Sequence, residues 1–208
     1  MESIYGAHRQ ELEETRDYLL EEIQKIREDM AKKTGGEDPV EHCLARIKSE
    51  ESMREKCRRK GLPENEHSAL EEIHDAVGIR IVCSFLSDVY TIRDGLAGLP
   101  ACEVVEEKDY IRHAKPNGYR SYHLILKVER GPQPVYAEIQ LRTISQDTWA
   151  ALEHHMKYKK AVSGDDALIS AELKRCADEL ASTDLSMQTI RDMIYQDKKE
   201  TTDENTAG

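Results

Sequence analysis

Alternating apolar and polar positions mark one strand more clearly than any other part of the chain. The apolar positions are Val135, Ala137, Ile139 and Leu141, and the polar positions are Tyr136, Glu138, Gln140 and Arg142. Because successive side chains of a strand point to opposite faces, the second face carries a carboxylate, an amide and a guanidinium. A strand facing solvent would be unremarkable, whereas one facing a cleft would suit a metal-bound phosphate. The pattern alone leaves both interpretations open.

Two helices are indicated near the start of the chain. Leucine and isoleucine recur at helical spacing over residues 11–30, and the loop that begins at Thr34 ends the pattern. The apolar stripe of this helix must pack on its own domain or on another subunit. Ser49 is expected to cap a second helix over 50–60, with an acidic first turn, a basic last turn and Gly61 as its stop.

Strands and helices then alternate. A β-branched run over 75–85 predicts a buried strand, with Asp75 at its entrance and Arg80 inside it. Further elements are a helix over 87–99 capped by Ser87 or Asp88, strands over 102–105 and 121–128, a hairpin into 135–142, and a helix after a capping box at 143–146. Strands mixed with helices indicate an α+β domain built on one mixed sheet.

The chain divides into four expected parts. A helical segment over 1–36 precedes an α+β domain over 37–160, and one or two amphipathic helices follow over 161–197. The last part, 198–208, is polar and expected to be disordered.

Composition favours a cytoplasmic protein. Hydrophobic residues make up 38% of the 208 residues, but none of the apolar runs approaches the ~20 residues of a membrane span. The first residues lack the apolar core of a signal peptide. The five cysteines are widely spaced and include no C-x-x-C pair, so reduced thiols are expected rather than disulfides or a zinc site.

Charge is distributed unevenly. The net charge of −11 argues against general nucleic-acid binding. Residues 46–60, however, contain seven Lys or Arg and three Glu, and residues 108–127 contain five Lys or Arg and one Asp. Two basic islands in an acidic chain suggest small polyanions such as nucleotides, although for each island alone a solvated face is the favoured explanation.

Two carboxylates, Asp75 and Glu138, stand beside these basic segments. Such oxygen ligands suit Mg²⁺, which takes one or two carboxylates together with substrate phosphates. His154 and His155 are adjacent and point about 100° apart on a helix, so they cannot share a metal. The chain has no phosphate-binding P-loop, no dinucleotide fingerprint and no serine nucleophile motif.

Four ordered motifs carry a family resemblance. They are D-A-V-G-I-R (75–80), G-Y-R-S-Y-H (118–123), E-I-Q-L-R-T (138–143) and W-A-A-L-E-H-H-M-K-Y-K (149–159). Together they resemble the synthetase domain of the RelA/SpoT family, over about residues 41–160. Because no hydrolase domain accompanies it, the chain is most similar to the small alarmone synthetases. The resemblance implies a nucleotidyltransferase-like fold. The apolar stripes of the terminal helices exceed what a small sheet can cover and predict a homo-oligomer, for which the resemblance makes a tetramer one expectation.

The implied reaction moves pyrophosphate from ATP to the 3′-hydroxyl of GDP or GTP and yields ppGpp or pppGpp. One alternative keeps the fold and changes the acceptor to ATP, ADP or the 3′ end of tRNA. Another is a non-catalytic relative that senses nucleotides or binds single-stranded RNA; it would be expected to lack a carboxylate or the stacking tyrosine, and both are present here.

The resemblance also assigns residues. By motif, Asp75 and Glu138 would hold Mg²⁺, and Glu138 would act as the base. Donor ATP would meet Arg46 and Arg80 at its adenine, and Lys48, Lys56 and Arg59 at its phosphates. The acceptor would meet Tyr119 at its guanine, and Lys115 and His123 at its phosphates, while Gln140, Arg142, Glu153 and His154 would shape the site.

Overall fold

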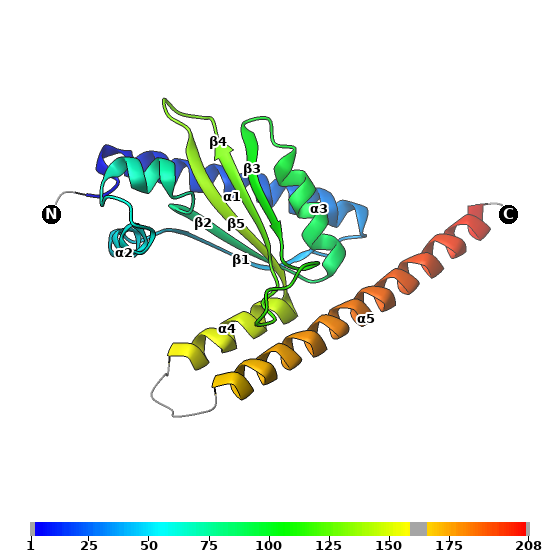
Figure 1. Cartoon of the computed structure of the whole chain (residues 1–208). Coiled ribbons are helices and arrows are strands. Elements are labelled where there is room, and N and C mark those ends of the chain that lie inside the picture. Colours follow the sequence, from blue (N-terminus) through cyan, green and yellow to red (C-terminus); the bar gives the residue numbers. More distant parts are fainter. Residues whose placement is uncertain (1–2, 159–165, 207–208) are drawn as a thin grey trace.

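A five-stranded mixed sheet forms the centre of the protein, in the order β1-β2-β5-β4-β3 (Figure 1). The strands are β1 (Val40–Ile47), β2 (Val77–Cys83), β3 (Cys102–Asp109), β4 (Tyr122–Val128) and β5 (Val135–Thr143). Strands β2 and β5 run parallel, and all other neighbours in this sheet are antiparallel. The structure is a computed structural model and describes residues 3–158 and 166–206. The expected α+β fold with one mixed sheet is confirmed.

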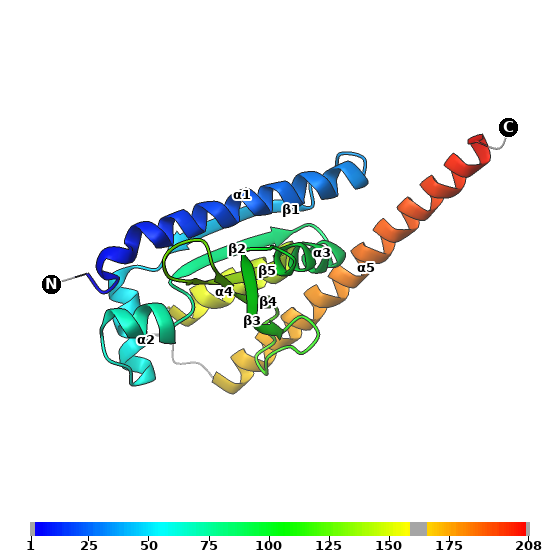
Figure 2. The same cartoon turned by 90° about the horizontal axis from the view of Figure 1, so that it is seen from above.

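Within the described residues, five α-helices accompany the sheet. They are α1 (Arg9–Lys33), α2 (Glu50–Lys60), α3 (Leu86–Ala97), α4 (Ile144–Tyr158) and α5 (Asp166–Thr206). Helices α1 and α3 cover one face of the sheet, as Figure 2 shows from above. The apolar stripe of α1, including Leu12, Leu19 and Ile23, is fully buried in the core of this domain. Helix α1 therefore packs on the sheet of its own domain. Burial of each of these side chains stabilises the fold by roughly 1.5–3 kcal/mol.

Local sequence signals set the ends of two helices as expected. The Ser49 hydroxyl accepts a hydrogen bond from the Ser52 amide at 3.3 Å, and Gly61 closes α2 with a φ of 71°. Thr143 and Gln146 form the expected reciprocal capping box, with both bonds at 3.2 Å. This box starts α4 directly at the end of β5.

The cap predicted for α3 is wrong. The N-cap residue is Phe85, which makes no side-chain capping bond. Asp88 instead accepts a hydrogen bond from Arg191 of α5 at 2.7 Å, and Gln188 of α5 accepts the Ser87 amide at 3.0 Å. A tertiary contact has therefore replaced the local one.

Helix α5 is 41 residues long and runs past the body of the domain (Figure 1). It extends to Thr206, into the segment expected to be disordered, where the sequence has no Gly or Pro before Gly208. Residues 159–165 lie outside the described residues, and the division into four parts remains a prediction. Within 3–158 and 166–206, each helix is too short or too polar to cross a membrane.

Candidate active site

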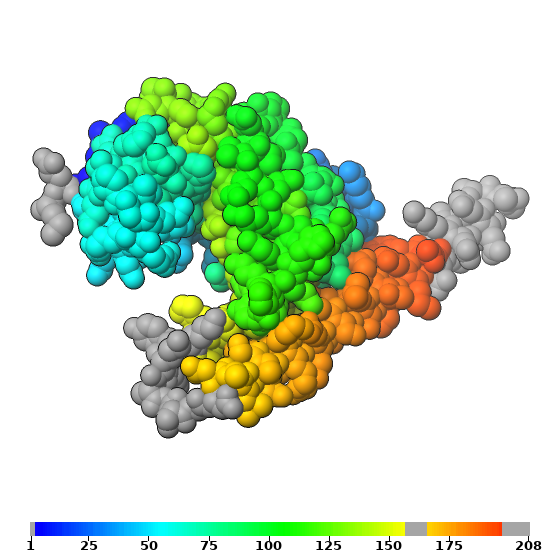
Figure 3. All heavy atoms as spheres, in the orientation of Figure 1, coloured from blue at the N-terminus to red at the C-terminus, as the bar shows by residue number. Residues whose placement is uncertain are grey.

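A pocket of about 290 Å³ opens on the sheet face opposite α1 and α3. In Figure 3 the surface is hollowed below α2 in cyan and above the yellow part of α4. The lining residues are Leu44, Ala45, Arg46, Lys48, Asp75, Gly78, Ile79, Arg80, Glu138 and Gln140. The polar face of β5 therefore faces a cleft, as the second of the two interpretations requires.

Strand register explains why these side chains meet. Arg46, Gly78 and Glu138 are opposite one another across β1, β2 and β5. In the neighbouring row, Arg80 is opposite Gln140. Gly78 contributes no side chain, so a slot remains on the pocket floor between a guanidinium and a carboxylate.

Asp75, at the entrance of β2, is held by two lysines. Its Oδ2 atom accepts hydrogen bonds from Lys48 Nζ, at 2.6 Å, and from Lys56 Nζ on α2. Its Oδ1 atom is buried and has no hydrogen-bond partner. A buried carboxylate oxygen without a partner is costly, so this atom is a ready ligand for a cation.

Glu138 is ionised by its surroundings. Its Oε1 atom lies 3.1 Å from Nδ1 of His123, and its Oε2 atom accepts the Gln140 amide at 3.1 Å. Burial raises the pKa of Glu138, but the bonds from His123 and Gln140 outweigh this effect and lower the pKa to about 2. The carboxylate is therefore negative at neutral pH.

A hydrogen-bonded chain leads away from this carboxylate. Nε2 of His123 lies 2.9 Å from the Tyr119 hydroxyl, which in turn accepts a bond from Arg142 at 2.9 Å. Because a carboxylate only accepts, a neutral His123 donates from Nδ1 to Glu138 and accepts the Tyr119 proton at Nε2. The ring of Tyr119 is only partly buried.

Arg142 lies beneath the pocket. Its side chain is 5% exposed and donates to Asp147, Tyr119 and Gln140. It therefore contacts Tyr119 and Gln140 from below the pocket surface, and its role in shaping the site stays a prediction. Because neighbouring side chains bury Arg142, a nucleotide in the pocket does not contact its guanidinium directly.

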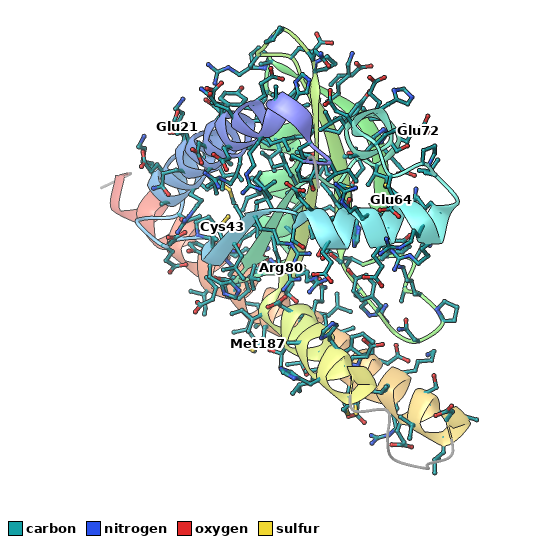
Figure 4. The ribbon with its side chains drawn as sticks, turned by 90° about the vertical axis from the view of Figure 1, so that its left-hand side faces the viewer. Glu21, Cys43, Glu64, Glu72, Arg80 and Met187 are labelled. Atoms are coloured by element: carbon teal, nitrogen blue, oxygen red, sulfur yellow. The ribbon has the colours of Figure 1, made fainter. Side chains whose placement is uncertain are left out.

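Asp147, on the first turn of α4, joins two arginines. Its Oδ1 atom lies 2.9 Å from Arg142 Nη1 and 3.5 Å from Arg80 Nη1. Burial and then the like charge of Arg142 lower the pKa of Arg80. Figure 4 shows Arg80 between the sheet and α4. Asp147 keeps these two cations in place despite their mutual repulsion.

The remaining expected residues lie outside the lining of the pocket. Nζ of Lys115, in the β3–β4 loop (residues 110–121), is 4.9 Å from the centre of the Tyr119 ring. Glu153 on α4 accepts a hydrogen bond at 3.3 Å from Asn117 of the same loop. Arg59, on the last turn of α2, and His154 on α4 are exposed and do not line the pocket.

A second hollow is larger, at about 450 Å³, but it is chemically unsuited to nucleotides. It lies between α1 and the β4–β5 turn and is lined by Glu11, Glu14, Asp17 and Glu21, with Arg130 as a cation. Four carboxylates repel phosphate. The smaller pocket is therefore the candidate nucleotide site, because its lining carries the positive charge that phosphate requires.

Two residues of the site, Gly78 and Asp147, were not predicted from the sequence. Gly78 interrupts a β-branched strand, and such a glycine often marks close approach of a ligand or backbone. Asp147 resembles an ordinary acidic residue in a first helical turn. Only the fold reveals that it contacts both Arg80 and Arg142.

Comparisons with known proteins agree with this geometry. The family described as "Region found in RelA / SpoT proteins" matches residues 45–163, more than half of the chain. The chain belongs to this family. GTP pyrophosphokinase YjbM of Bacillus subtilis is 33% identical over 162 residues, 76% of this chain and 75% of that protein.

Two further matches are with proteins from the same organism. GTP pyrophosphokinase YwaC is 45% identical over 128 residues, which are 60% of this chain and 61% of YwaC. The matched part of this RelA/SpoT family member thus spans less than two thirds of YwaC. The crystal structure of small alarmone synthetase 1 bound to its product pppGpp superposes with a TM-score of 0.74 at 30% identity, covering 91% of this chain and 94% of that one.

Proposed function

We propose that this protein transfers pyrophosphate from ATP to the 3′-hydroxyl of GDP or GTP and so makes ppGpp or pppGpp. The observation that carries this proposal is the pocket in which Asp75 and Glu138 lie among Arg46, Lys48 and Arg80. Support comes from the relatives named GTP pyrophosphokinase and from the product-bound synthetase structure. Transfers of this kind rely chiefly on positioning and charge neutralisation, which such a residue set supplies.

Donor ATP is assigned to the β1–β2 side of the pocket. Arg46 and Arg80 line the pocket beside the slot at Gly78, and their guanidinium groups can stack on a planar base. Lys48 and Lys56 then take the donor phosphates, with Arg59 at the rim. Both lysines are already directed at Asp75, so they can turn from a carboxylate to phosphate without leaving the site.

The acceptor is assigned to the β3–β4 loop. The partly exposed ring of Tyr119 offers a stacking platform for guanine, and Lys115 and His123 lie close enough to it to reach the acceptor phosphates. Gln140, Arg142 and Glu153 hold this arrangement through hydrogen bonds, and His154 borders it.

Mg²⁺ fits the two carboxylates. Among the described residues no group of three or more His, Cys, Asp or Glu side chains could hold a metal. Mg²⁺ is commonly bound by one or two carboxylates plus substrate phosphates, and the unpartnered Oδ1 of Asp75 fits such a role. When bound, Mg²⁺ would neutralise phosphate charge and polarise the reacting groups.

The chain's own groups align the reaction. Glu138 receives the hydrogen bond of the attacking 3′-hydroxyl and takes up its proton as the new bond to phosphorus forms. A carboxylate whose pKa is about 2 is a weak base, so alignment contributes more than proton affinity. The lysines and arginines balance the negative charge that shifts onto the leaving AMP.

An acceptor panel tests this function. ATP labelled at its γ-phosphate is incubated with GDP, GTP, ADP, ATP and tRNA in turn, with and without Mg²⁺. We expect labelled product with GDP and GTP, and only with Mg²⁺ present. Transfer to an adenine nucleotide or tRNA alone would support the same chemistry on another acceptor. Failure with every acceptor, together with single-stranded RNA binding that survives high salt, would support a non-catalytic relative.

We further propose that the protein acts in the cytoplasm as a homo-oligomer, for which a tetramer is possible. All five cysteines are free, as a reducing compartment favours. Large apolar side chains on α5 are exposed, among them Leu185 at 62% and Met193 at 59%. An exposed apolar face on a long helix suits contact with a second copy. Light scattering that detects only monomers would refute the oligomer.

A further inference from the structure

One face of α5 touches the β3–β4 loop, which carries Lys115 and Tyr119. Gly118 is buried and has a φ of +90°, and a Cβ added there would lie 2.7 Å from Cβ of Ala177. Contacts this short do not occur between real side chains. The loop backbone therefore packs directly on α5, and glycine is required both by the conformation and by the helix.

An ion pair joins the same two elements. Arg120, two residues after Gly118, donates from Nη2 to Oδ1 of Asp178 at 2.8 Å. The Arg120 side chain is 18% exposed and its Nε is buried without a partner. Burial of a guanidinium is costly unless a counter-charge compensates it. Asp178 is that counter-charge, and Lys174 holds the other oxygen of Asp178 at 2.6 Å.

Two more contacts fix α5 near the site. Asp184 accepts the Thr143 hydroxyl at 2.6 Å, where β5 ends, and both side chains are buried. Trp149 of α4 donates from Nε1 to the Leu173 carbonyl of α5 at 2.8 Å. Its ring centre lies 6.5 Å from that of Tyr119. Helix α5 thus contacts the loop while it is anchored to the strand that carries Glu138.

We infer that Asp178, acting through Arg120, is a positioning residue that holds the β3–β4 loop in the conformation that binds the acceptor nucleotide. This inference rests on the proposed function. When a loop is only partly in its binding conformation, apparent affinity falls in proportion to that fraction. Loss of the ion pair therefore weakens acceptor binding, while ATP binding on the β1–β2 side and turnover at saturation stay unchanged.

The test compares Asp178→Ala with Glu179→Ala. Glu179 is the next residue on α5 and pairs with Arg175 of the same helix, so its loss controls for charge and helix effects. We expect Asp178→Ala to raise the KM for GDP and GTP about fivefold, which is the change in affinity that the loss of one partly exposed ion pair produces. The KM for ATP, kcat and Tm should match those of Glu179→Ala.

A binding readout separates this inference from the enzymatic activity. Trp149 is the only tryptophan, so its fluorescence can be titrated with GDP and, separately, with a non-hydrolysable ATP analogue. We expect a weaker GDP response in Asp178→Ala, a smaller effect in Asp178→Asn, and no further loss when Arg120→Ala is combined with Asp178→Ala.

Several results would overturn the inference. Wild-type acceptor affinity in Asp178→Ala would do so, as would equal rises in both KM values with a lowered Tm, which indicate general destabilisation. If Asp178→Ala does not fold, the Asp178→Asn titration decides alone. Failure of the wild-type protein to bind guanine nucleotides would instead refute the proposed function, and the inference with it.

Discussion

Arg142 donates a hydrogen bond to the hydroxyl of Tyr119 across 2.9 Å, and so ties the β3–β4 loop to the strand that carries Glu138. The same hydroxyl reaches His123 at 2.9 Å. The ring thus has a defined orientation before any nucleotide arrives. Stacking on a preset ring costs less conformational entropy than stacking on a mobile one.

Tyr119 variants separate the ring from its hydroxyl. Because a stacked base contributes roughly 1–3 kcal/mol, Tyr119→Ala should raise the KM for GDP and GTP about 5- to 150-fold. Tyr119→Phe keeps the ring and should raise it only a few-fold. Steady-state kinetics with ATP saturating measures both values. Equal losses in the two variants would show that the hydroxyl, and not the ring, matters.

Glu138→Gln should abolish transfer while the fold stays intact. The amide is nearly isosteric, but it carries no charge for a cation and cannot take up a proton. We expect a loss of at least about 10²-fold in kcat, with an unchanged Tm. Thin-layer separation of labelled product and a thermal melt measure the two quantities.

The matched control for that variant is Glu129→Gln, an exposed carboxylate that pairs with Lys127 near the β4–β5 turn. It should retain full activity. A normal rate of alarmone synthesis by Glu138→Gln would contradict the role given to this carboxylate.

Gly78 variants test the slot between Arg46 and Glu138. A Cβ at residue 78 would lie 3.9 Å from Cγ of Arg46, an ordinary contact, so Gly78→Ala should behave nearly as wild type. Gly78→Leu fills the slot and should raise the KM for ATP about tenfold or more at similar Tm. Gly131→Leu, in the exposed β4–β5 turn, is the control. An unchanged ATP KM in Gly78→Leu would exclude the slot as the adenine site.

Asp184 gives a pH-dependent prediction for stability. Burial raises its pKa from 3.8, and the Thr143 hydrogen bond offsets this only in part. The folded protein therefore binds a proton more tightly than the unfolded chain, so stability falls as pH rises from 3.8 through the folded-state pKa. The Asp184→Asn variant keeps a hydrogen-bond acceptor for the Thr143 hydroxyl, but residue 184 no longer titrates. Its stability should therefore not fall with pH for this reason.

Denaturant unfolding of Asp184→Asn and wild type across pH 3–8 measures that difference. We expect the variant to gain in relative stability as pH rises through the window and to keep a constant advantage above it. A constant difference over the whole range would mean that Asp184 titrates alike in both states.

Sequence predicted the features that depend on neighbouring residues. The two faces of β5, the capping box at Thr143 and the Ser49 cap all follow from local spacing and hydrogen bonding. The family motifs then named Asp75 and Glu138, and the fold brings them into one pocket.

What could not be predicted depends on contacts between distant segments. Asp88 was expected to cap α3 and is buried against Arg191, more than a hundred residues away. Asp178 on α5 has the appearance of a solvated helix residue until Arg120 is found beside it. Alternation places Arg142 on the polar face of β5, but it does not show that neighbouring side chains cover Arg142 there.

Along strand β5, residues of the hydrophobic core alternate with residues of the candidate active site. Ala137 and Ile139 are fully buried on one side, while Glu138 and Gln140 line the pocket on the other. Insertion or deletion of a single residue would exchange the two sets. The length of β5 therefore cannot change during evolution, and the site can vary only by substitution at every second position of this strand. New specificity must then arise largely in the loops and helices that border β5.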